Sequence, residues 1–181
     1  MRTEWRDGLR DGLPIAVGYF AVSFSFGLLA TQAGLTAFQA GLISLTNLTS
    51  AGQFAGLTII TAGAGLGEMA LTQLVINLRY ALMSLALGQK LGPQVGTLKR
   101  CLIAFVDTDE IFAVAMGRPG RPTPAYMGGL GFLPLLGWTG GTLTGALASG
   151  VLPAAVISAL GIALYCMFVA VVAPVARRSR P

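Results

Sequence analysis

Arg79 is the most unusual residue in this 181-residue chain, because it stands in the middle of a long apolar stretch. It lies 11 residues after Glu68 and 11 residues before Lys90, with Asn77 two residues upstream. In a helix it would be about 16 Å from either end. An arginine at that depth of a bilayer costs on the order of 3 kcal/mol, so we expect it to face a polar cavity or a charged partner. The alternative is a static ion pair that only fixes helix packing.

Three carboxylates in the next apolar stretch are the expected partners of Arg79. Asp107, Asp109 and Glu110 follow the basic residue Arg100 at a distance that, in an antiparallel pair of helices, brings Asp109 to the depth of Arg79. One arginine cannot neutralise three carboxylates. The surplus carboxyl groups must be protonated, hydrated, or matched by a cation or a substrate ammonium, so we predict an ion pair and a proton-coupling site here.

A second interpretation of the same residues stays open. Residues 101–117 are short for a membrane span, and the cluster 107–110 would then be an exposed turn between two short apolar pieces.

The segment 46–53 is a further candidate, because polar and small residues interrupt a long apolar run. A break in a helix here would expose backbone N–H groups that favour an anion such as a carboxylate. An ordinary helix–helix contact would also explain small residues. We predict a substrate-binding segment, and its candidate residues are Asn47, Ser50, Gly52, Gln53, Asn77 and Arg79.

The elements that hold these residues must be membrane helices. Apolar residues make up 54% of the chain and charged residues 10%, and the blocks 12–67 and 122–176 contain no charge at all. A soluble core cannot bury two such blocks. The absence of His excludes His-dependent catalysis and His-ligated metals, and Cys101 and Cys166 have no metal-site spacing. The flanking basic clusters are typical of membrane topology and not of nucleic-acid binding.

We therefore predict an all-α integral membrane protein, a polytopic bundle of about six transmembrane helices with one of them discontinuous. Residues 1–181 would form a single transmembrane domain, in which residues 3–12 are either an amphipathic lead-in or a disordered tail. The expected spans are 13–33, 37–64, 69–89, 101–117, 124–147 and 152–175.

The distribution of Lys and Arg predicts that the N-terminus and the C-terminus are cytoplasmic. Six crossings place eight basic residues inside, and only Lys90, Lys99 and Arg100 outside. The inside set is Arg2, Arg6, Arg10, Arg118, Arg121, Arg177, Arg178 and Arg180.

Taken together, these residues resemble the AzlC family, the large subunits of two-component branched-chain amino acid transporters. The opening Gly8–Pro14, the Ala51–Phe54 segment, Asn77–Arg79 and Thr108–Glu110 match motifs of that family. Tyr80 stands where the family often has His. The resemblance also implies that the chain is short at its C-terminus.

The resemblance implies a permease of the bacterial plasma membrane, embedded in the lipid bilayer, that exports branched-chain amino acids together with a small AzlD-like membrane subunit. We expect proton coupling, no cofactor, no bound metal, no nucleic-acid partner and no enzymatic activity. Two alternatives remain: a membrane-embedded Mg²⁺-dependent enzyme of lipid phosphoryl chemistry, with the 107–110 carboxylates as ligands, and a passive scaffold subunit.

Overall fold

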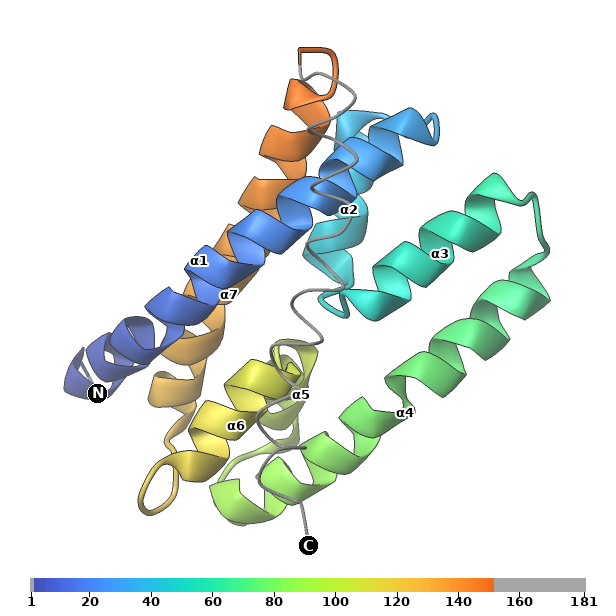
Figure 1. Ribbon diagram of the computed structural model, residues 1–181. Helices are drawn as coiled ribbons and strands as arrows, with labels where there is room; N and C mark the ends of the chain where they lie inside the picture. The colour runs from blue at the N-terminus through green and yellow to red at the C-terminus, as the bar shows by residue number, and fades with distance from the viewer. Residues whose placement is uncertain (1, 152–181) are drawn as a thin grey trace, which may run out of the picture.

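Seven α-helices and no strands make up residues 2–151, the part of the chain that the computed structural model describes. The prediction of an all-helical protein is confirmed for this part. The predicted helix 152–175 lies outside it. Three helices are long and four are short (Figure 1), and their bounds are α1 Arg2–Gln32, α2 Ala37–Thr46, α3 Ala51–Thr61, α4 Leu66–Leu91, α5 Thr97–Phe105, α6 Asp109–Gly117 and α7 Pro124–Ala148.

The long helices α1, α4 and α7 have the length to cross a bilayer. They contain 31, 26 and 25 residues, which corresponds to about 46, 39 and 37 Å, against a hydrocarbon core of about 30 Å. Among the described helices, α1 and α4 are also apolar enough to qualify as membrane spans. The first residues of α1 continue directly into the helix, so a disordered tail is excluded over residues 2–12.

Helices α1 and α7 run parallel and lie side by side along their length (Figure 1). Small residues allow this close approach. A Cβ atom on Gly12 would lie 2.6 Å from the Leu130 carbonyl oxygen, and one on Gly145 would collide with the backbone of Phe24. Helices α1 and α7 are therefore closely packed, and the short helices α2, α3, α5 and α6 contact this pair.

Helices α2 and α3 form a hairpin that enters the molecule and returns to the same end. Leu57 of α3 packs in one cluster with Ala40 of α2 and Ala30 of α1, close to the end of α1. Leu48, between the two helices, instead packs with Tyr19 in the middle of α1. The predicted interruption within 37–64 is present, but this segment turns back at its break and does not cross.

Helices α5 and α6 form a second hairpin, which enters from the opposite end. Near the start of α5, Arg100 Nη1 donates to the Gly88 carbonyl of α4 at 2.8 Å. Near the end of α6, the Met116 carbonyl accepts from Lys90 Nζ at 2.7 Å. Both outer ends of the hairpin therefore lie beside the end of α4. The structure thus divides the single helix expected over 101–117 into two short antiparallel helices.

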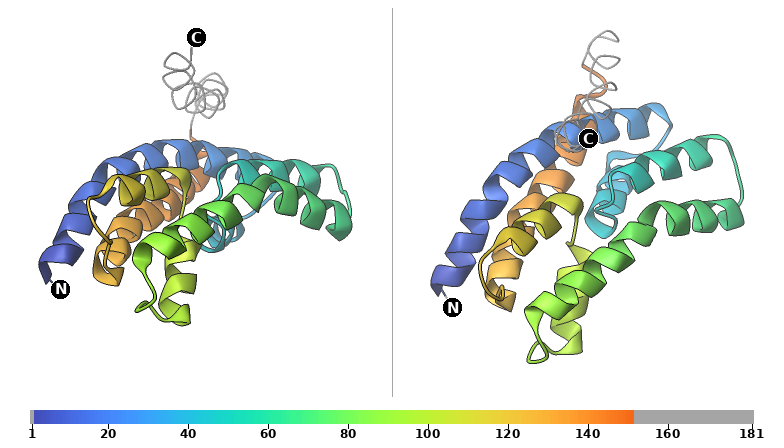
Figure 2. Two further views of the ribbon diagram at one scale, coloured as in Figure 1. Left: turned by 90° about the horizontal axis from the view of Figure 1, so that it is seen from below. Right: turned by 60° about the horizontal axis from the view of Figure 1, so that its bottom comes forward.

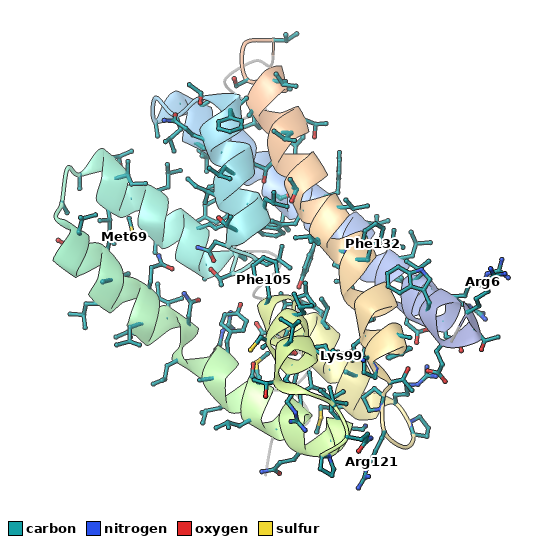
Figure 3. All side chains as sticks on the ribbon, turned by 180° about the vertical axis from the view of Figure 1, so that it is seen from behind. Arg6, Met69, Lys99, Phe105, Arg121 and Phe132 are labelled. Carbon is teal, nitrogen blue, oxygen red and sulfur yellow. The ribbon has the colours of Figure 1, made fainter. Side chains whose placement is uncertain are left out.

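The basic residues gather at one end of the molecule, which corrects the side predicted for Lys90, Lys99 and Arg100. Because the α5–α6 hairpin does not cross, the 92–96 loop lies at the end where α1 and α7 begin. All described Lys and Arg residues except Arg79 lie there, and Figure 3 labels Arg6, Lys99 and Arg121 at this end and Met69 toward the other. The set is Arg2, Arg6, Arg10, Lys90, Lys99, Arg100, Arg118 and Arg121.

Acidic residues of α1 form ion pairs with Arg118 and so hold the second hairpin against α1 at this end. Arg118, just after α6, lies 3.3 Å from Glu4 Oε2 and 3.9 Å from Asp7 Oδ2. Its guanidinium carbon stacks 3.9 Å from the centre of the Tyr126 ring. The start of α1 is thus part of the folded unit.

The order of elements repeats. Helix α1 is followed by the α2–α3 hairpin, and α4, which runs in the opposite direction, is followed by the α5–α6 hairpin (Figure 1 and the two views of Figure 2). Repeats of opposite orientation with interrupted helices near the middle of the bilayer are typical of secondary transporters.

Candidate functional site

The tips of the two hairpins approach the same residue, Tyr19 of α1. Its ring contacts Trp138 edge-on, with the ring centres 5.3 Å apart, and packs with Leu48 of the first tip. Its hydroxyl donates to Thr108 Oγ1 of the second tip at 2.6 Å and also contacts Glu110 Oε2. The two interrupted helices therefore meet in the middle of the molecule.

The first tip, residues 47–50, carries no charge. Thr49 Oγ1 donates to Asn47 Oδ1 at 2.7 Å, and Ser50 adopts a φ of 41°, a value that favours glycine. Helix α3 begins after Ser50 without a side-chain cap and without an acidic residue in its first turn. Its N-terminal N–H groups and its helix dipole are therefore not matched by a carboxylate of α3 itself.

The second tip, residues 106–108, leads into a helix start of opposite character. Asp109 and Glu110 occupy the first turn of α6, where a helix dipole stabilises carboxylates. Asp107 and Thr108 are buried, with 2% and 4% exposure. The open interpretation of 101–117 thus described the division correctly, whereas the turn itself is buried and not exposed.

Arg79 of α4 reaches this second tip. Its Nη1 atom lies 2.7 Å from Asp109 Oδ2, and its Nη2 atom donates to the Tyr80 hydroxyl at 3.1 Å. The two charged side chains are 41% and 39% exposed in the described chain. The structure therefore brings Arg79 together with the acidic cluster, but it pairs the guanidinium with Asp109 alone.

The other two carboxylates have hydroxyl neighbours. Glu110 contacts Tyr19, as described above, and Asp107 Oδ2 lies 3.5 Å from Ser84 Oγ. Asp107 and Asp109 thus face α4, where Ser84 and Arg79 lie, and Glu110 faces Tyr19 of α1. Within residues 2–151, no group of three acidic, His or Cys side chains is arranged to hold a metal ion, so the residues described do not fit the Mg²⁺ site of the enzyme alternative.

A chain of amides joins α4 to the first tip. Gln73 Nε2 donates to the Gly52 carbonyl at 2.8 Å, and Asn77 Nδ2 donates to Gln73 Oε1 at 3.0 Å. A side chain at Gly52 would collide with Thr49 Oγ1 and would approach Gln73 Oε1 to 2.7 Å. The role of Gly52 in the structure is therefore to let the amides of α4 approach the tip.

Gln53 is buried, and both the oxygen and the nitrogen of its side-chain amide are hydrogen-bonded. Its Oε1 atom accepts from Trp138 Nε1 at 2.7 Å, and its Nε2 atom donates to Ser44 Oγ at 2.9 Å. Ser44 in turn lies 2.6 Å from Thr142 Oγ1. This network anchors the first hairpin to α7, so the structure gives Gln53 a positioning role beside the site.

Several buried polar atoms of this region have no partner. A buried polar atom without a hydrogen bond costs about 1–3 kcal/mol, so such atoms are rare and often functional. In the described residues they are Ser50 Oγ, Asn77 Oδ1, Arg79 Nε, Asp107 Oδ1 and Thr139 Oγ1. All except Thr139 belong to the predicted site residues.

An apolar cavity of about 230 Å³ adjoins the first tip, between α2, α3 and α4. Asn47, Gln53 and Gln73 contribute polar groups to its lining, and most of the other lining residues are apolar. The lining consists of Phe26, Ile43, Thr46, Asn47, Gly52, Gln53, Gly56, Leu57, Ile60, Met69 and Gln73.

Sequence reasoning missed several residues that build this centre. Gln73 precedes Asn77 by four residues and so shares its helix face, which is a signal that could have been used. Tyr19, Trp138 and Ser84 carry no such signal, because each is distant in sequence from the groups that it contacts.

The fold is that of a helical membrane protein, and comparison with known proteins identifies the family. The family model described as "AzlC protein" matches residues 14–152, and the chain belongs to this family. It is 33% identical over 169 residues to the inner membrane protein YgaZ of Escherichia coli (strain K12), which covers 90% of this chain and 69% of that relative.

Two further relatives are uncharacterized membrane proteins. One from Archaeoglobus fulgidus is 31% identical over 172 residues, covering 94% of this chain and 75% of the relative. One from Helicobacter pylori (strain J99) is 26% identical over 146 residues, covering 79% of this chain and 63% of the relative. No solved structure matches the chain.

Proposed function

We propose that this protein is a transporter subunit that moves branched-chain amino acids across the bacterial plasma membrane and works with a small AzlD-like membrane subunit. Membership of the AzlC family supports amino-acid transport. The single structural observation that carries the proposal is the meeting of two opposed hairpin tips, one uncharged and one acidic, beside Arg79 and partnerless buried polar atoms.

The two tips complement the two charges of an amino acid. The start of α3 provides N–H groups and a positive helix dipole for the carboxylate, with Ser50, Asn77 and Arg79 as neighbouring donors. The carboxylates of Asp107, Asp109 and Glu110 face the ammonium. Since Asp109 is the one of these three carboxylates that pairs with Arg79, another carboxyl beside this tip is available to carry the coupled proton, and exchange of that proton for the substrate drives export.

The orientation follows from the gathered basic residues. We place the end with the α1 N-terminus and the 92–96 loop in the cytoplasm, because basic residues favour that side, and expect the C-terminus there as well. The test is cysteine labelling in a Cys101→Ser, Cys166→Ser background. Gln32→Cys should react with a membrane-impermeant maleimide on intact cells, and Gln94→Cys only after permeabilisation. Labelling of Gln94→Cys on intact cells would contradict this topology.

Transport itself is tested in vesicles that contain the protein with its small partner subunit. Counterflow of labelled valine should appear and should respond to an imposed pH gradient at fixed membrane potential. No valine, leucine, isoleucine or methionine movement above that of protein-free vesicles would refute the proposal.

A further inference from the structure

We propose that the apolar cavity between α2, α3 and α4 binds the aliphatic side chain of the substrate, and that Gly56 and Met69 set the size of side chain it accepts. This inference rests on the proposed function. It assigns a binding surface that lies beside the predicted site residues and extends along α3 away from the tip.

The shape of the cavity suits a small ligand. Its volume of about 230 Å³ is below the range of about 300–1,000 Å³ typical of pockets for drug-sized ligands. The wall contains Phe26, Ile43, Leu57 and Ile60, which offer no hydrogen bonds from their side chains. Such a wall selects by fit, and each methylene group of a ligand then changes affinity or rate by roughly 10–200-fold.

The polar groups of the cavity lie at the end where the substrate's charged groups would bind. Asn47 lies in the first tip, and Gly52 and Gln73 join α3 to α4 by a hydrogen bond of 2.8 Å. An amino acid whose carboxylate lies at the start of α3 can therefore extend its side chain along α3 toward Gly56. Polar groups near the first tip and apolar surface farther along α3 follow each other in the order that an aliphatic amino acid requires.

Gly56 of α3 and Met69 of α4 are adjacent residues in the lining of this cavity. A Cβ atom on Gly56 would lie 3.6 Å from Met69 Sδ and 3.4 Å from Gln73 Nε2, which is ordinary van der Waals contact. Gly56→Ala therefore fits the fold and removes volume from the cavity. Met69→Ala adds volume at the same place.

The experiment measures transport of alanine, valine, leucine and phenylalanine in vesicles that contain the small partner subunit. Gly56→Ala should lower the ratio of leucine to alanine transport by about tenfold. Met69→Ala should raise the ratio of phenylalanine to valine transport. The matched controls are Gly18→Ala, where an added Cβ meets nothing within 4 Å, and Met116→Ala, on α6 outside the cavity. Both should keep the wild-type ratios.

The outcomes separate this inference from the proposed function. Wild-type transport with unchanged ratios in both cavity variants would overturn the inference and leave the function standing, because the cavity would then be a passage or a packing defect. Absence of transport in the wild type would refute both. A change of ratio in Met69→Ala alone would still place the side chain in this cavity, even if Gly56→Ala were not inserted into the membrane.

Discussion

The two hairpins have the same backbone plan and opposite electrostatics. Each consists of two short helices that meet near the middle of the molecule, and in each the second helix begins at the tip. The start of α3 has no acidic residue, whereas the start of α6 carries Asp109 and Glu110. Because a helix start attracts anions, the carboxylates of Asp109 and Glu110 match the dipole at the start of α6, whereas no acidic residue of α3 matches the dipole at its own start.

On the function proposed above, this difference would let a repeated fold bind a zwitterion. One half of the repeat would hold the carboxylate at a helix start, and the other half would offer carboxylates to the ammonium. Tyr19 contacts both tips, so a structural change at one tip can be transmitted to the other through this side chain.

The largest effect is expected from separating Arg79 and Asp109. We predict that Arg79→Ala and Asp109→Asn each reduce valine transport below detection, because each change strands a partly buried charge. We expect the amount of the double variant in the membrane to be higher than the amount calculated by adding the losses of the two single variants. Arg121→Ala, which removes an exposed base at the end where most described basic residues gather, is the control. Strictly additive losses of membrane level would argue against direct pairing.

A smaller and more specific effect is expected at Glu110. Glu110→Gln keeps the shape of the side chain but cannot exchange a proton. We predict that exchange of labelled for unlabelled valine persists in part while the response to an imposed pH gradient disappears. Vesicle transport across a pH series at fixed potential measures both. A gradient response that survives in this variant would move the proton site to Asp107 or Asp109.

Removal of the Tyr19 hydroxyl should have a moderate effect. Tyr19→Phe keeps the ring contact with Trp138 but loses the hydrogen bonds to the second tip. Since a hydrogen bond to a charged group contributes about 1.5–3 kcal/mol, transport should fall roughly tenfold or more. Tyr126→Phe, which loses a 2.7 Å hydrogen bond to Asp11 of α1 outside the two tips, is the matched control and should transport normally. If transport fell equally in Tyr19→Phe and Tyr126→Phe, the loss would not be specific to the contact between Tyr19 and the second tip.

Much of this fold could be predicted from the sequence. The predictions that were wrong have a physical reason. The charge-free blocks identify membrane helices, and the polar segment 46–53 correctly predicts an interruption. Hydropathy reports that a segment lies in the membrane but not whether it crosses or turns back, so the segments 37–64 and 101–117 were expected to cross. That assumption also put the 90–100 loop on the opposite side.

In the candidate site, too, some contacts could be predicted from the sequence and others could not. The equal depth of Arg79 and Asp109 follows from counting residues along two neighbouring helices, and the structure has them 2.7 Å apart. The contacts of Tyr19 with Thr108 and of Gln53 with Trp138 join residues 89 and 85 positions apart. No periodicity in a single sequence reports such contacts.

Two conservative variants, Ser50→Gly and Glu110→Gln, give the most direct test of the claim that each tip recognises one charge of the substrate. The measurement is inhibition of labelled valine exchange by valinamide, which lacks the carboxylate charge, and by 2-oxoisovalerate, which lacks the ammonium. Ser50→Gly suits the φ of 41° at that position and removes a donor from the first tip. Our account predicts that Ser50→Gly weakens inhibition by 2-oxoisovalerate alone, and that Glu110→Gln weakens inhibition by valinamide alone. If both variants weakened both inhibitors to the same extent, the assignment of opposite charges to the two tips would be wrong.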